Sequence, residues 1–236
     1  MGKLQPGRYP ADPDVATVAT LIADPVRAAI LFALLDGSEL PASELAFRAG
    51  ASPQAASTHL AKLAKGGLIV PRAAGRQRLF RLASAQIAHA LEALAAIAPP
   101  RKVVALSQGT SMQRLREARS CYDHLAGRLG VALTDHFLET GAIRVSKGEF
   151  AVTRRGSAEF SKLSIDVDEA RAKRRGFARA CMDWTERRPH LAGSLGAAVR
   201  ERFLAAGWIE RNPHDRALRI MPKCSAELAR FGIRLG

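Results

Sequence analysis

The chain has 236 residues, and its 47% hydrophobic content allows two compact domains with buried cores. Lys and Arg outnumber Asp and Glu 36 to 22, for a formal charge of +14. A basic excess of this size favours a polyanionic partner and is not what a metabolic enzyme needs. The sequence shows no signal-peptide core and no long apolar run, so we expect a cytoplasmic protein with no membrane partner.

Cap and stop signals predict four short helices in the first 65 residues. In two of them, a capping Asp or Ser is followed by proline at the first helical position, and glycines follow several of the helix ends. The predicted helices span about 15–22, 25–35, 42–49 and 53–65.

A basic hairpin and a fifth helix follow. Leu68–Val70 and Leu79–Leu82 are predicted strands around the turn RAAGRQR, and apolar spacing predicts a helix over about 84–98. Pro99-Pro100 then breaks the periodicity. We therefore expect a domain at 1–98, a linker at 99–107 and a second domain at 108–236.

The helix predicted from about Pro53 to Lys65 has one face for a core and one for DNA. At about 100° per residue, Ala56, Leu60 and Leu63 share a face, and small polar or cationic side chains lie opposite. Such a helix, followed by a basic hairpin, can enter the major groove. The expected DNA contacts are Gln54, Ala55, Ser57, Thr58, His59, Lys62, Lys65, Arg72, Arg76 and Arg78. Of these, His59 is more typical of a packing or phosphate-contacting residue than of a base contact.

Residues 15–97 resemble the ArsR family of dimeric repressors. DPVRAAILFALL is similar to the family's second helix, SELAFRAGASPQAASTHLAKLAKGGLI to its helix-turn-helix, and GRQRLFRLA to its wing. The resemblance implies a winged helix-turn-helix, binding to double-stranded DNA, and repression relieved by a small ligand. It also implies a homodimer interface, for which the candidate residues are Val15, Val18, Ile22, Ile87, Leu91 and Leu94.

The chain departs from the family at its usual metal-sensing positions. The third helix carries Glu44–Arg48 where the family has cysteines, and Ala88-His89-Ala90 offers one isolated histidine. Cys121, Cys181 and Cys224 are odd in number and widely spaced, so they predict neither a disulfide framework nor a CxxC zinc knuckle.

The second half contains a duplication. Residues 124–143 align with 190–209 with eleven identities in twenty positions, and a cysteine and an aspartate precede each copy. A basic hairpin and a short helix follow each copy. We predict two winged-helix-like repeats, at about 119–164 and 179–234. The whole chain is then mainly α with small β-wings (α+β).

Two interpretations of the repeat's polar residues remain open. Cys121, His124, Cys181, Asp183 and His190 are candidate ligands for a metal or metalloid effector such as zinc, cadmium or arsenite. Alternatively, they are buried packing residues that both copies inherited, in which case no cofactor is required. Packing is favoured here because Cys121 and His124 have helical spacing, whereas His190 lies nine residues beyond Cys181.

The sequence predicts a sequence-specific DNA-binding regulator, a dimeric repressor released by a small ligand or metal ion. An enzyme is disfavoured, because no phosphate-binding glycine loop, GxSxG or HExxH motif is present. The remaining alternative is a winged-helix scaffold that binds protein partners.

Overall fold

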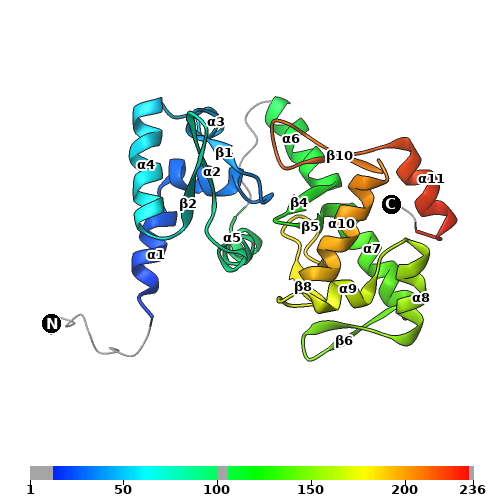
Figure 1. Ribbon diagram of the computed structural model, residues 1–236. Coiled ribbons are helices and arrows are strands. Elements are labelled where there is room, and N and C mark those ends of the chain that lie inside the picture. The colour runs from blue at the N-terminus through cyan, green and yellow to red at the C-terminus, as the bar shows by residue number, and fades with distance from the viewer. Residues whose placement is uncertain (1–12, 100–105, 234–236) are drawn as a thin grey trace. The chain divides into compact units, whose positions relative to one another are not determined.

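The computed structural model describes residues 13–99 and 106–233, which divide into two compact units (Figure 1). The first comprises residues 13–32 and 39–83, and the second comprises residues 33–38, 84–99 and 106–233. Both consist of helices with small antiparallel sheets, which confirms the mainly α fold with β-wings. Residues 100–105, the centre of the predicted linker, lie outside the described part of the chain.

The first unit begins with four helices whose bounds agree with the predicted ones to within a few residues. They are α1 Val15–Ile22, α2 Pro25–Ala33, α3 Ala42–Arg48 and α4 Pro53–Lys65. At the start of α2, the Asp24 carboxylate accepts a hydrogen bond from the Arg27 amide at 2.9 Å, as the Asp-Pro signal predicts. No single helix in the described residues is long and apolar enough to cross a membrane; α1 and α2 together have the length and composition, but they meet at a bend of 88°.

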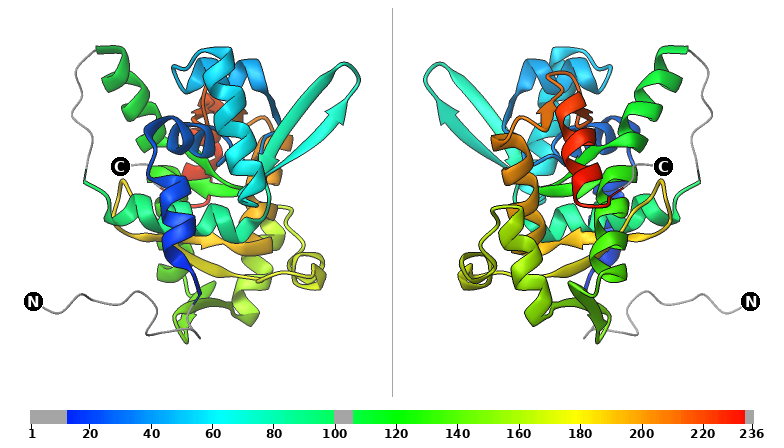
Figure 2. Two further views of the ribbon diagram at one scale, coloured as in Figure 1. Left: turned by 90° about the vertical axis from the view of Figure 1, so that its left-hand side faces the viewer. Right: turned by 90° about the vertical axis from the view of Figure 1, so that its right-hand side faces the viewer.

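A three-stranded sheet completes the first unit. The strands are β1 Leu40–Pro41, β2 Ile69–Ala74 and β3 Gln77–Leu82, and β3 lies in the middle. Pairing continues to Ala74 opposite Gln77, so most of the basic stretch predicted as a turn is strand. Figure 2 shows β2 and β3 as an extended hairpin, the shape expected of a wing.

The second unit consists of α5 and α6, two repeats and a helix between them. Its elements are α5 Ala85–Ile97, α6 Leu106–Glu117, β4 Arg119–Cys121, β5 His124–Ala126, α7 Gly127–Glu139, β6 Ile143–Ser146, β7 Glu149–Val152, α8 Arg154–Lys162, α9 Val167–Ala172, β8 Arg179–Met182, β9 Pro189–Ala192, α10 Gly193–Ala205, β10 Ile209–Arg211, β11 Leu218–Ile220 and α11 Pro222–Arg230. Each repeat thus has the order hairpin, helix, hairpin, helix. Both helices and the second hairpin of each copy were predicted from the sequence. The first hairpin of each copy was not predicted.

The helix α5 belongs to the second unit, although we expected it to complete the domain 1–98. Its Glu92 is buried and forms an ion pair with Arg216, which is also buried. A carboxylate inside a protein needs such a partner. Apolar periodicity located the helix, but it carried no information about the partner of Glu92.

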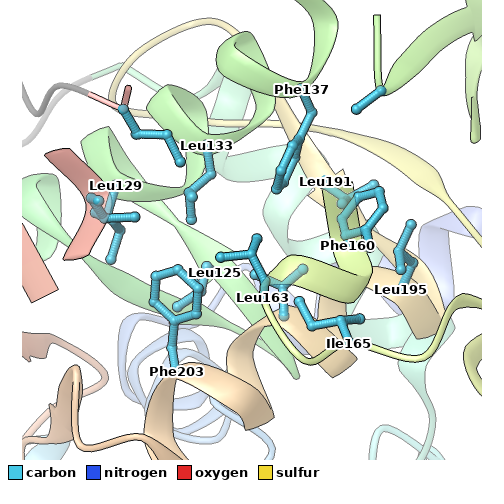
Figure 3. Close-up of a cluster of buried hydrophobic side chains, with 14 of the residues drawn as sticks. Leu125, Leu129, Leu133, Phe137, Phe160, Leu163, Ile165, Leu191, Leu195 and Phe203 are labelled. Atoms are coloured by element: carbon cyan, nitrogen blue, oxygen red, sulfur yellow. The ribbon is translucent and has the colours of Figure 1, made fainter. Parts of the chain in front are cut away.

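The two repeats share one core, shown in Figure 3. Equivalent positions of the two copies supply its centre, and each is at most 6% exposed: Leu125 and Leu191, Leu129 and Leu195, Leu133 and Val199, Phe137 and Phe203. The packing is reciprocal, since α7 of the first copy lies on β9 of the second and α10 lies on β5. Neither copy therefore has a complete core of its own.

Truncation of a shared core residue should destabilise the second unit as a whole. We expect Phe203→Ala to lower the free energy of unfolding by about 3–5 kcal/mol, because a fully buried ring is lost and a cavity remains. Both tryptophans, Trp184 and Trp208, lie in this unit, so their fluorescence during urea unfolding reports on it alone. Val145→Ala, at a side chain that is 64% exposed, is the control and should change stability by less than about 0.5 kcal/mol. Equal effects of the two changes would contradict the shared core.

Candidate nucleic-acid interface and metal centre

The helix α4 has the predicted ends and the predicted register. The Ser52 hydroxyl accepts a hydrogen bond from the Ala55 amide at 3.3 Å and caps the helix. Ala56, Leu60 and Leu63 are buried. The opposite face is consequently turned to solvent.

That outer face carries most of the predicted DNA contacts. Exposed side chains on it are Gln54, Ser57, Thr58, Lys62 and Lys65, whereas Ala55 is half-buried. The Thr58 hydroxyl donates to the Gln54 carbonyl at 3.2 Å, which leaves its oxygen free to accept.

His59 lies apart from this face. It is half-buried, and its Nδ1 is 3.6 Å from a carboxylate oxygen of Asp24. This position agrees with the interpretation of His59 as a packing residue rather than a base contact.

The arginines of the wing differ in how they are engaged. Arg72 binds the Glu39 carboxylate through two of its nitrogens, and the hydrogen bond from Arg72 lowers the pKa of Glu39. Arg76 and Arg78 are exposed near the tip of the hairpin. Arg76 and Arg78 are therefore more available for binding phosphate than Arg72, which is bound to Glu39.

The predicted interface residues on α1 and α5 differ in exposure. Val15 and Val18 are 70% and 41% exposed, and α1 buries no residue at all. On α5, Leu94 is 43% exposed, but Leu91 is fully buried within the single chain. Leu91 therefore packs internally, while the α1 valines and Leu94 are free to contact a second copy. The other two candidates, Ile22 and Ile87, are half-buried.

The described residues contain one cluster suited to a metal ion, and it lies in the second unit. Its members, Cys121, His124, Cys181 and His190, are four of the five ligands predicted from the sequence. The positions used by the resembled family hold other chemistry: Glu44 is bound to Arg48 at 2.7 Å, Leu45 is buried and Phe47 is exposed.

The expected helical placement of Cys121 and His124 is wrong, because both lie on strands. Cys121 of β4 pairs directly with His124 of β5, and Cys181 of β8 pairs directly with His190 of β9. The extra residues of the second copy lengthen that hairpin without changing the register of Cys against His. The two copies are therefore equivalent in how they pair cysteine with histidine. Their unequal spacing in the sequence does not favour packing residues over metal ligands.

The four ligand atoms converge from the two hairpins. The sulfurs of Cys121 and Cys181 are 3.9 Å apart, the Nε2 atoms of His124 and His190 are 3.2 Å apart, and all four atoms lie within 4.8 Å of one another. Cys121, His124 and His190 are fully buried, and Cys181 is half-buried. The cluster thus brings two sulfurs and two nitrogens together at a mostly buried position.

The cluster shifts the pKa values of its own members. The contact between the two sulfurs raises the pKa of the Cys121 thiol and lowers that of the Cys181 thiol, and hydrogen bonds with both histidines lower the Cys181 pKa further. Burial lowers the pKa of His124, but its hydrogen bonds with Asp123 and Cys181 outweigh burial and raise the pKa above its usual value.

Each histidine has a carboxylate behind its other ring nitrogen. Nδ1 of His124 is 3.4 Å from an oxygen of Asp123, and Nδ1 of His190 is 3.6 Å from an oxygen of Asp183. Both aspartates stand two residues after the cysteine of their copy. Asp183, a candidate ligand in the sequence, is not one of the four converging residues and lies behind His190.

Asp183 also joins the two repeats. It forms a fully buried ion pair with Arg119 of β4 at 3.0 Å and accepts hydrogen bonds from Gly127 at 2.7 Å and from the Thr185 hydroxyl at 2.6 Å. Burial raises the pKa of Asp183, but the Arg119 charge and these donors hold it well below its usual range. Arg119 was not identified from the sequence. The signal available there was its position two residues before Cys121.

The basic run 171–179 is partly engaged inside the second unit. Arg171 stacks on the Phe177 ring with 4.2 Å to its centroid, and Arg175 pairs with Asp123. Arg179 is 3.5 Å from Glu149. These contacts reduce the charge that the run offers to DNA.

The chain is similar to named transcriptional regulators. A family model described as a helix-turn-helix domain matches residues 22–72. The chain is 44% identical over 209 residues to the uncharacterized HTH-type transcriptional regulator YdfF of Bacillus subtilis, covering 89% of this chain and 92% of the relative. It is 40% identical over 77 residues to the HTH-type transcriptional regulator CmtR of Mycobacterium tuberculosis, covering 33% of this chain and 64% of that protein.

The similar solved structures each cover about two fifths of this chain. NolR from Sinorhizobium fredii is 29% identical with a TM-score of 0.36, covering 41% of this chain and 96% of that one. The cadmium metal-sensor CmtR from Mycobacterium tuberculosis is 34% identical with a TM-score of 0.31, covering 39% and 98%. A homodimeric winged helix-turn-helix domain from Mycobacterium bovis is 29% identical with a TM-score of 0.33, covering 40% and 86%.

Neutralising Asp183 should destabilise the second unit. We expect Asp183→Asn to lower its free energy of unfolding by about 3–5 kcal/mol at neutral pH, because Arg119 is left buried without a counter-charge. The folded-state pKa of Asp183 is depressed, so its contribution is fully present above the unfolded-state value of about 3.9 and is lost as the pH falls through the folded-state value. Wild type and variant should therefore converge in strong acid.

Tryptophan fluorescence during urea unfolding measures this difference across pH. Asp168→Asn, at an exposed aspartate of the same unit, is the matched control and should be nearly neutral. A constant difference between wild type and Asp183→Asn down to strong acid would show that the carboxylate charge is not the cause.

Proposed function

We propose that this chain, which belongs to the HTH-type transcriptional regulators, is a homodimeric repressor that contacts its operator through α4 and anchors on phosphates through the hairpin β2–β3. The observation that carries the proposal is the division of α4 into a buried apolar face and an exposed polar and cationic face. A polar outer face alone is typical of any surface helix. The combination that favours DNA binding is this capped helix followed by a hairpin with exposed Arg76 and Arg78.

The side chains on the outer face suit particular groups of DNA. Gln54 can bind adenine with two hydrogen bonds, Thr58 can contact a base edge or a thymine methyl group, and Lys62 can reach guanine or phosphate. Arg76 and Arg78 extend the positive charge to the backbone or the minor groove. This division of tasks makes α4 the source of specificity and the wing a source of affinity.

A second copy of the chain is the proposed partner of α1 and α5. Val15, Val18 and Leu94 are exposed apolar side chains on these helices. Symmetric dimers place two recognition helices about one helical turn of DNA apart, which matches an inverted-repeat operator. Exposed valines on a helix with no buried residue support an interface rather than a free surface.

An effector is the remaining part of the proposal. Repression is useful to a cell only if it can be relieved, and the C-terminal unit carries the concentrated Cys and His chemistry. We place the effector there rather than on α3, where Glu44 and Arg48 pair with each other. An enzyme receives no support, because the relatives are named as regulators.

Base contacts and phosphate contacts should respond differently to substitution. Gln54→Ala should weaken binding to the operator by about 1–3 kcal/mol and relax the preferred base at one position. Arg76→Ala should weaken binding to operator and random DNA alike, and should reduce the slope of log affinity against log salt by about 1. Fluorescence anisotropy with both DNAs over a range of salt measures both effects.

The control for lost charge is Arg219→Ala. Arg219 is exposed in the second unit and paired with Glu210, so its removal should leave both DNA affinities nearly unchanged. An unaltered base preference in Gln54→Ala would place the recognition surface elsewhere. No binding of wild type to any genomic fragment at moderate salt would favour the protein-binding scaffold instead.

Charges placed on the exposed α1 and α5 side chains should dissociate the dimer. We expect Val18→Glu with Leu94→Glu to give monomers with weak operator affinity, since two carboxylates would be buried against apolar surface. Light scattering gives the mass, and Val145→Glu, at an exposed valine of β6, is the control. A wild-type monomer that binds one half-site tightly would refute the dimer.

A further inference from the structure

We propose that Cys121, His124, Cys181 and His190 together bind one zinc-class ion, a closed-shell thiophilic divalent cation in tetrahedral coordination, at the junction of the two repeats. The proposal rests on ligand geometry, burial and the surroundings of the ligands. It rests on the proposed function only for its regulatory consequence.

The separations between ligand atoms match a tetrahedral site. With zinc–sulfur bonds of about 2.3 Å and zinc–nitrogen bonds of about 2.0–2.1 Å, a tetrahedral angle places two sulfurs about 3.8 Å apart and two nitrogens about 3.3 Å apart. The observed separations are 3.9 Å for Cys121 to Cys181 and 3.2 Å for Nε2 of His124 to Nε2 of His190. An ion can enter with little rearrangement of these pairs.

The burial of the cluster also indicates an ion. Two imidazole nitrogens facing each other share at most one proton, and two sulfurs at 3.9 Å make at best a weak hydrogen bond. A cation would be bound by all four groups at once. Two thiolates would balance its two charges, so the filled pocket would be neutral in a low-dielectric core.

The carboxylates behind the histidines complete the pattern of a metal site. Histidines that bind a metal usually donate a hydrogen bond from the N–H of their other ring nitrogen to a carboxylate, which fixes the tautomer. Asp123 and Asp183 stand at 3.4 and 3.6 Å from the Nδ1 atoms of His124 and His190. The buried His190 Nδ1 makes no hydrogen bond, and a small shift of its ring would let it donate one to the Asp183 carboxylate.

Two glycines allow the two halves of the site to approach each other closely. A Cβ on Gly196 of α10 would lie 2.4 Å from the Leu191 carbonyl and 3.1 Å from the Cβ of His124. A Cβ on Gly130, the equivalent residue of α7, would lie 2.5 Å from the Leu125 carbonyl and 3.7 Å from the Cβ of His190. The absence of a side chain at both positions lets each helix approach the hairpins closely enough for the ligands to meet.

The ligand set selects the class of ion. Two sulfurs and two imidazoles favour zinc or cadmium and are poor ligands for magnesium or calcium, which take oxygen. All four positions are supplied by the protein, as in sites where the metal holds a fold rather than performs catalysis. The regulatory consequence would follow from the ion fastening one repeat to the other.

The test uses the full chain, reduced and stripped of metal by a chelator. Addition of Co²⁺ should give one equivalent of bound ion per chain, with the intense visible bands of tetrahedral cobalt and a thiolate charge-transfer band. Zinc should displace the cobalt and abolish these bands. Octahedral-type weak bands, or no binding by the folded wild-type chain, would overturn the proposal without any variant being needed.

Variants assign the ligands. Cys121→Ser with Cys181→Ser should abolish the bands, whereas Cys224→Ser should retain them, because Cys224 is buried in α11 outside the cluster. Asp123→Asn should keep the bands but weaken zinc binding about 10–100-fold, since Asp123 orients His124 without being a ligand itself. Full zinc affinity in the folded double-serine variant would refute the assignment.

The regulatory consequence has a separate readout. Zinc or cadmium added to the operator complex should release DNA from the wild-type chain and from Cys224→Ser, but not from the double-serine variant. By linkage, DNA should weaken ion binding by the same factor. Ion binding that leaves operator affinity unchanged would overturn the ion as effector while the metal site stands; operator binding that is absent at every ion concentration would count against the proposed function instead.

Discussion

Each repeat of the second unit packs its helix on the other repeat's first hairpin, and this exchange determines what lies at the centre. The apolar faces of α7 and α10 form one core, because Leu129 and Leu195 belong to the same cluster of buried side chains. The same exchange brings the cysteine and histidine of each hairpin inward. Polar chemistry is thereby enclosed at the junction, where its geometry is set by the packing of both copies.

Enclosed polar groups need hydrogen-bond partners, and in the second unit one side chain supplies several of them. The Asp183 carboxylate accepts from Arg119, Gly127 and Thr185, so one residue neutralises a buried guanidinium and satisfies backbone donors of both repeats. The first unit follows the opposite plan. The proposed DNA contacts stand on the exposed face of α4, and the buried face of this helix is purely apolar. The site proposed in the first unit is therefore open to solvent, whereas the site proposed in the second unit is mostly buried.

Local signals explain why the ends and register of α4 could be predicted closely. The strand pairing that brings the Cys and His side chains together could not be predicted in this way. Ser52, Pro53 and the double glycine act within one helical turn, so the ends of α4 follow from the sequence alone. The hairpin β4–β5 has strands of three residues, too short for a periodic pattern, and the spacing of Cys121 and His124 fits a helix equally well. The pairing of Cys121 with His124 across the two strands is set by tertiary structure, so local sequence signals do not predict it.

The recurrence of the residues held more information than their spacing did. Cys, then Asp two residues on, then His before Leu-Ala-Gly occurs in both copies, and the additional residues of the second copy fall within its hairpin beyond the Cys181–His190 pair. An insertion in a hairpin loop changes the sequence distance between two facing residues without moving them apart. The membership of α5 in the second unit was hidden for a related reason, since nothing near Glu92 in the sequence points to Arg216, 124 residues away.

The reciprocal placement of α7 and α10 has an evolutionary consequence. A single ancestral repeat would have carried one Cys–His pair and half a core, so two separate molecules would have had to meet about a twofold axis to complete either. Two copies in one chain make that encounter intramolecular, so its effective concentration is fixed by the connecting chain and not by expression level. Joined copies can also differ from each other. Thr134 of α7 and Arg200 at the equivalent position of α10 now make different contacts, with the Leu191 amide and the Ser120 hydroxyl respectively.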